Sequence, residues 1–222
     1  MADSDLDYLF KFDNLIGCDE VGRGPIAGPV NSCAVSIESH QSDLIEKLIK
    51  LNVTDSKKLT EKRRKKILET LNIDVSEITQ NKIYENSALG EKFSFVIGEH
   101  SHDDIDRMNI LQASLSAMKN ASDKLIQGKT KILVDGNKTF DSAAADIEFV
   151  IKGDSKFVII GLASIIAKVF RDEKMKALDI LYPGYNLAKH AGYPTKEHRD
   201  AVKKLGPCKI HRKSFKGVKE YL

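Results

Sequence analysis

The sequence predicts an α/β protein in which a mixed β-sheet is flanked by helices and followed by a helical C-terminal region. Short apolar or alternating runs typical of strands come early, and segments with helical periodicity lie between and after them. Neither an internal repeat nor a Gly/Ser-rich linker divides the 222 residues. A chain of this length, 41% hydrophobic and 30% charged, can bury a substantial core.

The strands are expected where apolar residues alternate with polar ones or run together. Residues 14–19 form a short apolar run, and Val30 to Ile37 alternates as a half-buried strand does. Phe93, Phe95 and Ile97 alternate in the same way. The five expected strands cover residues 14–19, 30–37, 92–100, 131–137 and 146–154.

Four helices follow from apolar spacing and capping residues. Ser101, with Asp104 three residues on, is a capping signal for one long helix. Pro194 and Thr195 open the last helix. The expected helices cover residues 60–71, 101–126, 161–182 and 195–205.

Composition excludes several classes of protein. No apolar run approaches the roughly 20 residues that a membrane span needs, so no membrane association is expected. The first residues are acidic, unlike a secretory signal. Cys18, Cys33 and Cys208 are odd in number and unpaired in spacing, which favours reduced thiols in the cytoplasm and argues against a zinc site.

Basic residues gather in two blocks although the net charge is only +3. Residues 57–66 hold seven Lys or Arg against one Glu, and residues 196–222 hold nine against three acids. Each block could be a solvated helix face. Together with a carboxylate cluster, they favour a protein that binds a polyanion, because Lys and Arg displace counterions from phosphates.

Four acids are candidates for a metal site. Asp19 and Glu20 end the first strand beside a Gly-rich turn, and Asp135 ends an apolar strand. Sites in α/β sheets gather at such carboxyl ends, although Asp-Gly is also a common turn. Asp172 continues the apolar stripe of its helix and is expected to face inward. The alternative is a cationic partner, but Arg171 and Lys168 are expected on other faces.

A cage of carboxylates without His or Cys suits Mg²⁺ or Mn²⁺. Two such ions are how many nucleases attack a phosphodiester in line. The turn of Gly22, Arg23 and Gly24 beside the cage lets backbone amides approach a nucleic-acid strand, and Arg23 can contact a phosphate.

The chain resembles the ribonuclease HII (type 2 ribonuclease H) family nearly from end to end. The motifs that carry the resemblance occur in the family's order: GCDEVGRGPIAGPV, DSKKLT, IDRMNILQASLSAM, VDGN, KGDS, ASIIAKVFRDEKM, GYPTKEH and LGPCKIHRKSF. The related type 3 enzymes carry an extra N-terminal domain and a Glu as their last acid. Here about a dozen residues precede the first strand and the last acid is Asp172, which favours type 2.

The resemblance implies an RNase H-like fold. It implies a short N-terminal extension at residues 1–14, a catalytic domain at 15–182 and a basic, helical C-terminal region at 183–222. It also implies an endonuclease that hydrolyses the RNA strand of RNA–DNA hybrids. The enzyme would also cut 5′ of ribonucleotides embedded in duplex DNA, leaving 5′-phosphate and 3′-hydroxyl ends.

The family's functional residues carry over onto matching positions. Two divalent ions, Mg²⁺ or Mn²⁺, would be bound by the four acids Asp19, Glu20, Asp135 and Asp172. The sugar would be read by Gly22, Arg23, Gly24 and Tyr193, because the 2′-hydroxyl is the local mark that separates RNA from DNA. The nucleic-acid backbone would be contacted by Lys57 and Lys58. For His198 and His211, a structural or phosphate-contact role is expected.

Two other functions stay open at this point. One is a non-catalytic binder of RNA–DNA hybrids, which would gain from losing negative charge near phosphates. The other is a different two-metal nuclease of the same superfold, such as a junction resolvase. A monomer is expected, and the tail FKGVKEYL shows no sliding-clamp motif.

Overall fold

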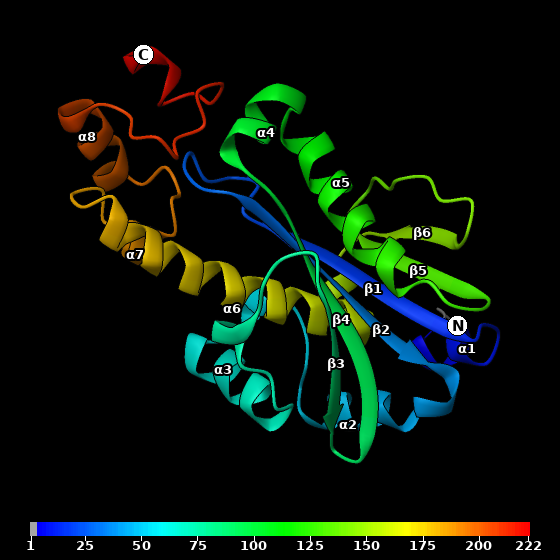
Figure 1. Ribbon diagram of the computed structural model, residues 1–222. Helices are drawn as coiled ribbons and strands as arrows, with labels where there is room; N and C mark the ends of the chain where they lie inside the picture. Colours follow the sequence, from blue (N-terminus) through cyan, green and yellow to red (C-terminus); the bar gives the residue numbers. More distant parts are fainter. Residues whose placement is uncertain (1–3) are drawn as a thin grey trace.

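The computed structural model describes residues 4–222, so the first three residues of the expected N-terminal extension lie outside the described part. It contains a six-stranded sheet in the order β3-β4-β2-β1-β5-β6 (Figure 1). β1 is antiparallel to β2 and parallel to β5, which is parallel to β6. The sheet is therefore mixed, as predicted. The strands are β1 (Asn14–Val21), β2 (Val30–Glu38), β3 (Ile83–Ala88), β4 (Glu91–His100), β5 (Thr130–Asp135) and β6 (Asp146–Val150).

Helices pack on both faces of this sheet (Figure 1). The helices are α1 (Asp5–Leu9), α2 (Asp43–Lys50), α3 (Glu61–Thr70), α4 (His102–Met108), α5 (Ile110–Ser122), α6 (Val158–Leu181), α7 (Leu187–His190) and α8 (Lys196–Leu205). Leu15 of β1 lies in the core that contains α6, whereas Ile16 and Cys18 lie in the core that contains α5. Side chains therefore alternate between the two faces along β1.

Helix α6 lies directly against β1. A Cβ atom added to Gly17 would come within 2.7 Å of the backbone of Ile159 and Ile160, so only glycine allows this approach. Asp19 follows Gly17 by two residues and thus points to the α6 face, while Glu20 points to the other. The close packing at Gly17 fixes where the end of β1 sits relative to α6.

The expected strands and helices are confirmed, with small shifts at their ends and one break. The helix expected over residues 101–126 is divided into α4 and α5 at Asn109. Asn109 has φ +70°, outside the helical region, and its side-chain oxygen accepts hydrogen bonds from the N–H groups of Leu111 and Gln112. Asn109 therefore ends α4, and its side chain caps the start of α5. The structure adds α1, α2, α7 and β3, which the sequence did not predict.

The C-terminal region packs against the loop that follows β1. A separate apolar cluster joins Ile26 and Ala27 of that loop to Met175 of α6 and to Tyr185 and Val202 of the C-terminal region. Within residues 4–222, no helix is long and apolar enough to cross a membrane. The boundaries of the expected regions at residues 15 and 183 stay predictions.

Candidate active site

Asp19 is a buried carboxyl group at the end of β1, with 7% of the residue exposed. Burial raises its pKa well above the usual range, and the negative charges of Glu20 and Asp135 raise it further. A hydrogen bond with Ser164 of α6 acts in the opposite direction. The pKa of Asp19 stays raised because the hydrogen bond with Ser164 does not offset burial and the two neighbouring negative charges.

Asp135 ends β5, the parallel neighbour of β1. Its Oδ1 atom accepts a hydrogen bond of 2.7 Å from the backbone N–H of Gly153. Because β1, β5 and β6 are parallel, their carboxyl ends meet at one edge of the sheet. This edge brings Asp19, Glu20 and Asp135 together, as predicted.

Asp154 is a fourth acid at the same edge, in the turn (Gly153–Ser155) that follows β6. Burial raises its pKa to about 6, together with the charges of Asp135 and Asp55. Residue-by-residue assignment from the sequence missed it, although the KGDS motif contains it. The available signal was its place shortly after a strand that is expected to lie beside that of Asp135.

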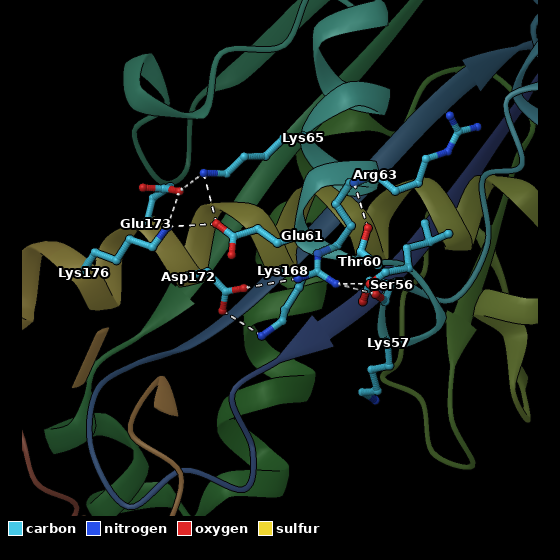
Figure 2. A network of polar contacts seen from close by, with 12 residues as sticks. Ser56, Lys57, Thr60, Glu61, Arg63, Lys65, Lys168, Asp172, Glu173 and Lys176 are labelled. Atoms are coloured by element: carbon cyan, nitrogen blue, oxygen red, sulfur yellow. Dashed lines mark hydrogen bonds and ion pairs between the residues drawn. The ribbon is translucent and has the colours of Figure 1, made fainter. Parts of the chain in front are cut away.

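Asp172 does not join this cluster. It is half-buried on α6, where it accepts a hydrogen bond of 2.7 Å from Lys168 Nζ (Figure 2). It also lies 3.8 Å from Arg64 Nη2. Asp172 is eight residues after Ser164, the α6 residue bonded to Asp19, which is about 12 Å along a helix. Asp172 therefore has cationic partners in this structure, and its expected metal-ligand role stays a prediction.

The expectation that Lys168 lies on another helix face than Asp172 is wrong. Residues four apart lie on the same face of a helix, so Lys168 precedes Asp172 by one turn and reaches it. Arg64 comes from α3, across from α6, and its distance in sequence gave no indication of the contact.

Glu20 lies between the acids and the Gly-rich turn. Burial raises its pKa, Arg23 lowers it, and Asp135 raises it again. Arg23 Nη1 is 3.3 Å from Glu20 Oε1. The guanidinium of Arg23 is therefore directed toward the acidic cluster.

Gly24 of the turn lies against Tyr193, whereas Gly22 lies against Arg171. Gly22 has φ +95°, and a Cβ atom there would overlap Arg171. A Cβ atom on Gly24 would come within 3.2 Å of the Tyr193 ring. Tyr193 is 38% exposed, and its carbonyl oxygen lies 3.0 Å from Nδ1 of His198.

Lys57 faces the acidic cluster. Burial alone would lower its pKa, but the charges of Asp19, Asp55 and Asp154 outweigh it and raise the pKa. The Nζ atom of the adjacent Lys58 donates a hydrogen bond of 2.8 Å to Ser155 Oγ, next to Asp154. Both lysines therefore lie at this edge of the sheet.

His198 and His211 form a buried pair below Tyr193. Their Nε2 atoms are 3.1 Å apart, and burial lowers the pKa of each to about 4. At this distance the Nε2–H of one ring can donate to the other only if the accepting Nε2 carries no proton, so the two rings cannot both be protonated without losing the bond. This arrangement fits the structural role expected for them.

The acidic cluster has the donor set of a site for hard divalent cations. Within residues 4–222, no group of three or more His, Cys, Asp or Glu side chains is already arranged to hold a metal ion. The oxygens of Asp135 and Glu20 are engaged with the Gly153 N–H and with Arg23 instead. Burial and the charge of Asp135 raise the pKa of Asp19, Glu20 and Asp154, a cost that a bound cation would relieve. All the donors are oxygens, which suit Mg²⁺ and Mn²⁺. The residues therefore fit such ions.

Comparison of the sequence with known proteins gives one consistent result. The family model described as Ribonuclease HII matches residues 16–218. A ribonuclease HII of Francisella tularensis subsp. tularensis is 43% identical over 208 residues, which cover 94% of this chain and 98% of that protein. The protein of the same name from subsp. novicida is 43% identical over 204 residues, covering 92% and 97%.

The fold comparison agrees. The ribonuclease H2 of Pyrococcus horikoshii superposes with a TM-score of 0.64 at 25% identity, covering 94% of this chain and 96% of that one. An RNase HII from Archaeoglobus fulgidus, solved in complex with PCNA, gives 0.65 at 21% identity, covering 91% and 95%. A Bst RNase HIII with Mn²⁺ gives 0.62 at 18% identity, covering 94% of this chain and 68% of that one. The chain therefore belongs to the ribonuclease HII family, the metal-dependent endonucleases that hydrolyse the RNA strand of RNA–DNA hybrids.

Proposed function

We propose that Asp19, Glu20, Asp135 and Asp154 bind the divalent ions of this endonuclease, two per site, with Mg²⁺ or Mn²⁺ as the ions. The observation that carries the proposal is the hydrogen bond of 2.7 Å from the Gly153 N–H to Asp135 Oδ1, which holds the turn containing Asp154 at the end of β5. Burial, and after it the charge of Asp135, raises the pKa of Asp154, in agreement with this placement. Asp172, neutralised by Lys168 and Arg64, takes a structural role.

Bound divalent ions would supply Lewis-acid stabilisation of the phosphate and an activated water. The chain's own residues supply the arrangement. Asp19 is fixed by burial and by Ser164, and Asp135 by the Gly153 N–H. Lys57 adds a positive charge beside the cluster, where a scissile phosphate brings negative charge.

The turn of Gly22, Arg23 and Gly24, together with Tyr193, would select the sugar. Its N–H groups can approach the strand because the turn carries no side chain at two of three positions. Tyr193, packed against Gly24 and partly exposed, offers a ring for stacking on the sugar. The enzyme would cut on the 5′ side of an embedded ribonucleotide, leaving it with a 5′-phosphate.

The experiment is cleavage of a labelled DNA duplex that contains one ribonucleotide, with Mg²⁺, with Mn²⁺ and with chelator. A metal-dependent cut 5′ of the ribonucleotide is the expected result. A long RNA–DNA hybrid and a four-way DNA junction serve as comparison substrates. Binding to the hybrid without any cut would favour the non-catalytic alternative, and cleavage of the junction alone would favour a resolvase.

Cytoplasmic location is also proposed, on the ground that Cys18, Cys33 and Cys208 are free thiols. A monomer and the lack of tight binding to a sliding clamp stay predictions. The PCNA complex is a property of the Archaeoglobus protein, and Mn²⁺ binding a property of the Bst RNase HIII. The preferred metal of this chain is decided by the cleavage experiment.

A further inference from the structure

Arg212 is a fully buried arginine behind the loop that contains the sugar-reading turn. Its exposed fraction is 0%, although it carries a charge. Its guanidinium donates hydrogen bonds to loop carbonyl oxygens alone: from Nε to Gly28 (3.0 Å), from Nη1 to Arg23 (3.0 Å) and Pro25 (2.7 Å), and from Nη2 to Gly22 (2.6 Å) and Pro29 (3.1 Å). An arginine has five N–H donors, and here the loop takes up all of them.

In this arrangement the charge of Arg212 has carbonyl partners in place of a carboxylate. A buried charge is costly unless it is paired and hydrogen-bonded. Five carbonyl dipoles directed at one guanidinium supply that compensation. Burial lowers the pKa of Arg212 to about 9, which leaves the group charged at neutral pH.

The carbonyl groups of the turn are therefore directed inward, and its N–H groups are left on the other side. In the part of the chain that the structure describes, no hydrogen bond is found for the N–H groups of Gly22, Arg23 or Gly24. Further along the loop, by contrast, the N–H of Ile26 donates to Gly192 and that of Gly28 to Ile210. Unpaired N–H groups thus occur at the three positions proposed to read the 2′-hydroxyl.

Contacts of Arg212 and of the two residues after it fix the position of its side chain. Its guanidinium lies 5.1 Å from the ring centre of Phe215, a cation–π contact. Asp106 of α4 accepts hydrogen bonds from the N–H groups of Lys213 and Ser214, the next two residues. The N–H of Arg212 donates to the carbonyl of Ile26. The C-terminal segment therefore presents the guanidinium at a fixed place.

We propose that Arg212 is a positioning residue for substrate selection: it holds the carbonyls of Gly22 and Arg23, and because C=O and N–H of one peptide unit point in opposite directions, it presents the N–H groups of Arg23 and Gly24 to the ribose. The inference rests on the proposed function, because it assumes that this turn reads the sugar. It assigns the specificity of the turn to a residue about 190 positions away in sequence.

The test compares Arg212→Gln and Arg212→Lys with the wild type on two substrates, under single-turnover conditions. One is a duplex with a single ribonucleotide, and the other is a long RNA–DNA hybrid. A hybrid offers a 2′-hydroxyl at every sugar of its RNA strand, so a loosened turn can still find one, whereas the duplex offers a single position. We expect the ratio of the two cleavage rates, duplex over hybrid, to fall about tenfold in Arg212→Gln and less in Arg212→Lys.

Asn14→Ala is the matched control. Asn14 is fully buried at the opposite end of β1, where it donates to the Leu125 carbonyl and accepts from Ser36 Oγ. Its removal costs stability without touching the loop, so the ratio should stay at the wild-type value. An unchanged ratio in folded Arg212→Gln would overturn the proposal. A wild type that cuts neither substrate would instead overturn the proposed function.

A readout without catalysis covers the case in which Arg212→Gln does not fold. In Arg212→Lys, the amide resonances of Gly22, Arg23 and Gly24 should shift or broaden in the free protein, while that of Gly153 at the acidic cluster stays in place. Unchanged resonances in the turn would contradict the positioning role.

Discussion

The backbone N–H of Gly153 donates a hydrogen bond of 2.7 Å to Oδ1 of Asp135. This bond joins the end of β5 to the turn Gly153–Ser155, in which Asp154 directly follows Gly153. Asp154 is thereby held at a set place relative to Asp135, near enough that the charge of one raises the pKa of the other. In the proposed site, the fourth acid thus comes from a short turn after β6, whereas the sequence analysis placed it on the long helix α6.

Replacement of Gly22 by alanine should strongly reduce cleavage. The residue has φ +95°, and the added Cβ would overlap Arg171, so the turn must move. We expect a destabilisation of about 1–3 kcal/mol and a loss of cleavage of at least about tenfold. Urea unfolding and single-turnover cleavage measure the two effects.

Gly90→Ala is the control for backbone strain alone. Gly90 has φ +81°, but a Cβ atom there would meet nothing within 4 Å. It should lose stability and keep its cleavage rate per folded molecule. If Gly22→Ala lost no more cleavage than Gly90→Ala, the shape of the turn would not matter to the reaction.

Without divalent ions, the acidic cluster should make the protein less stable as the pH rises. Asp154 titrates near 3.9 in an unfolded chain and at about 6 in the folded one. The folded state therefore holds more protons between these values, and stability falls as the pH rises from about 4 to about 6. The melting temperature in chelator, followed across this range, measures the slope.

Asp154→Asn should remove part of that slope. At pH 7 it should raise the melting temperature of the metal-free protein by about 2–4 °C, equivalent to on the order of 1 kcal/mol. The same variant should gain less stability than the wild type when Mg²⁺ or Mn²⁺ is added. A metal-free Asp154→Asn that melts below the wild type at pH 7 would argue against charge repulsion at this position.

The buried pair of His198 and His211 should make the folded protein less stable as the pH falls, which is the opposite of the trend expected for the acidic cluster. Burial lowers the pKa of His198 and His211 from about 6.5 to about 4, so the folded state holds fewer protons between these values. Their contribution is fully present above pH 6.5 and is lost as the pH falls toward 4. Ring-proton shifts by NMR should show no protonation of either ring at pH 5.5, and midpoints near 6.5 would contradict the pairing.

Asp5 should contribute to stability because it caps the start of α6, a helix far from it in sequence. Its buried carboxylate accepts hydrogen bonds of 3.0 Å from the N–H groups of Val158 and Ile159, at the start of α6. Phe157, the residue that precedes the helix, has no side chain able to cap it. Asp5→Ala should cost about 2 kcal/mol in urea unfolding. Asp7→Ala, on the exposed side of α1, should cost less, and equal losses would argue against the cap.

The sequence predicted most of the sheet because the strand signal is local. Alternation and apolar runs identified β1, β2, β4, β5 and β6, and three of the four site acids follow from strand ends. The break at Asn109 was missed because the apolar spacing continues through it. Only the left-handed backbone and the capping by its side chain show the break.

What remained unpredictable depends on contacts between distant residues. Lys168 could have been recognised as the partner of Asp172, four residues on, but Arg64 could not. The carbonyl partners of Arg212 lie about 190 residues earlier, and a backbone carbonyl leaves no mark in the sequence. Tyr193 came from the family resemblance alone, because it does not stand out by spacing or composition. Lys57 begins a basic block that composition revealed, but its backbone contact came from the resemblance.

The most direct test of the account compares cleavage by Asp154→Asn and Asp172→Asn on a duplex with one ribonucleotide, in saturating Mg²⁺ and in Mn²⁺. Both variants remove one negative charge, from the strand-edge cluster and from the α6 ion pair respectively. The account predicts that Asp154→Asn loses cleavage by at least about a hundredfold, while Asp172→Asn stays within about tenfold of the wild type. A folded Asp154→Asn that cuts at the wild-type rate, beside an inactive Asp172→Asn, would contradict it and return Asp172 to the metal site.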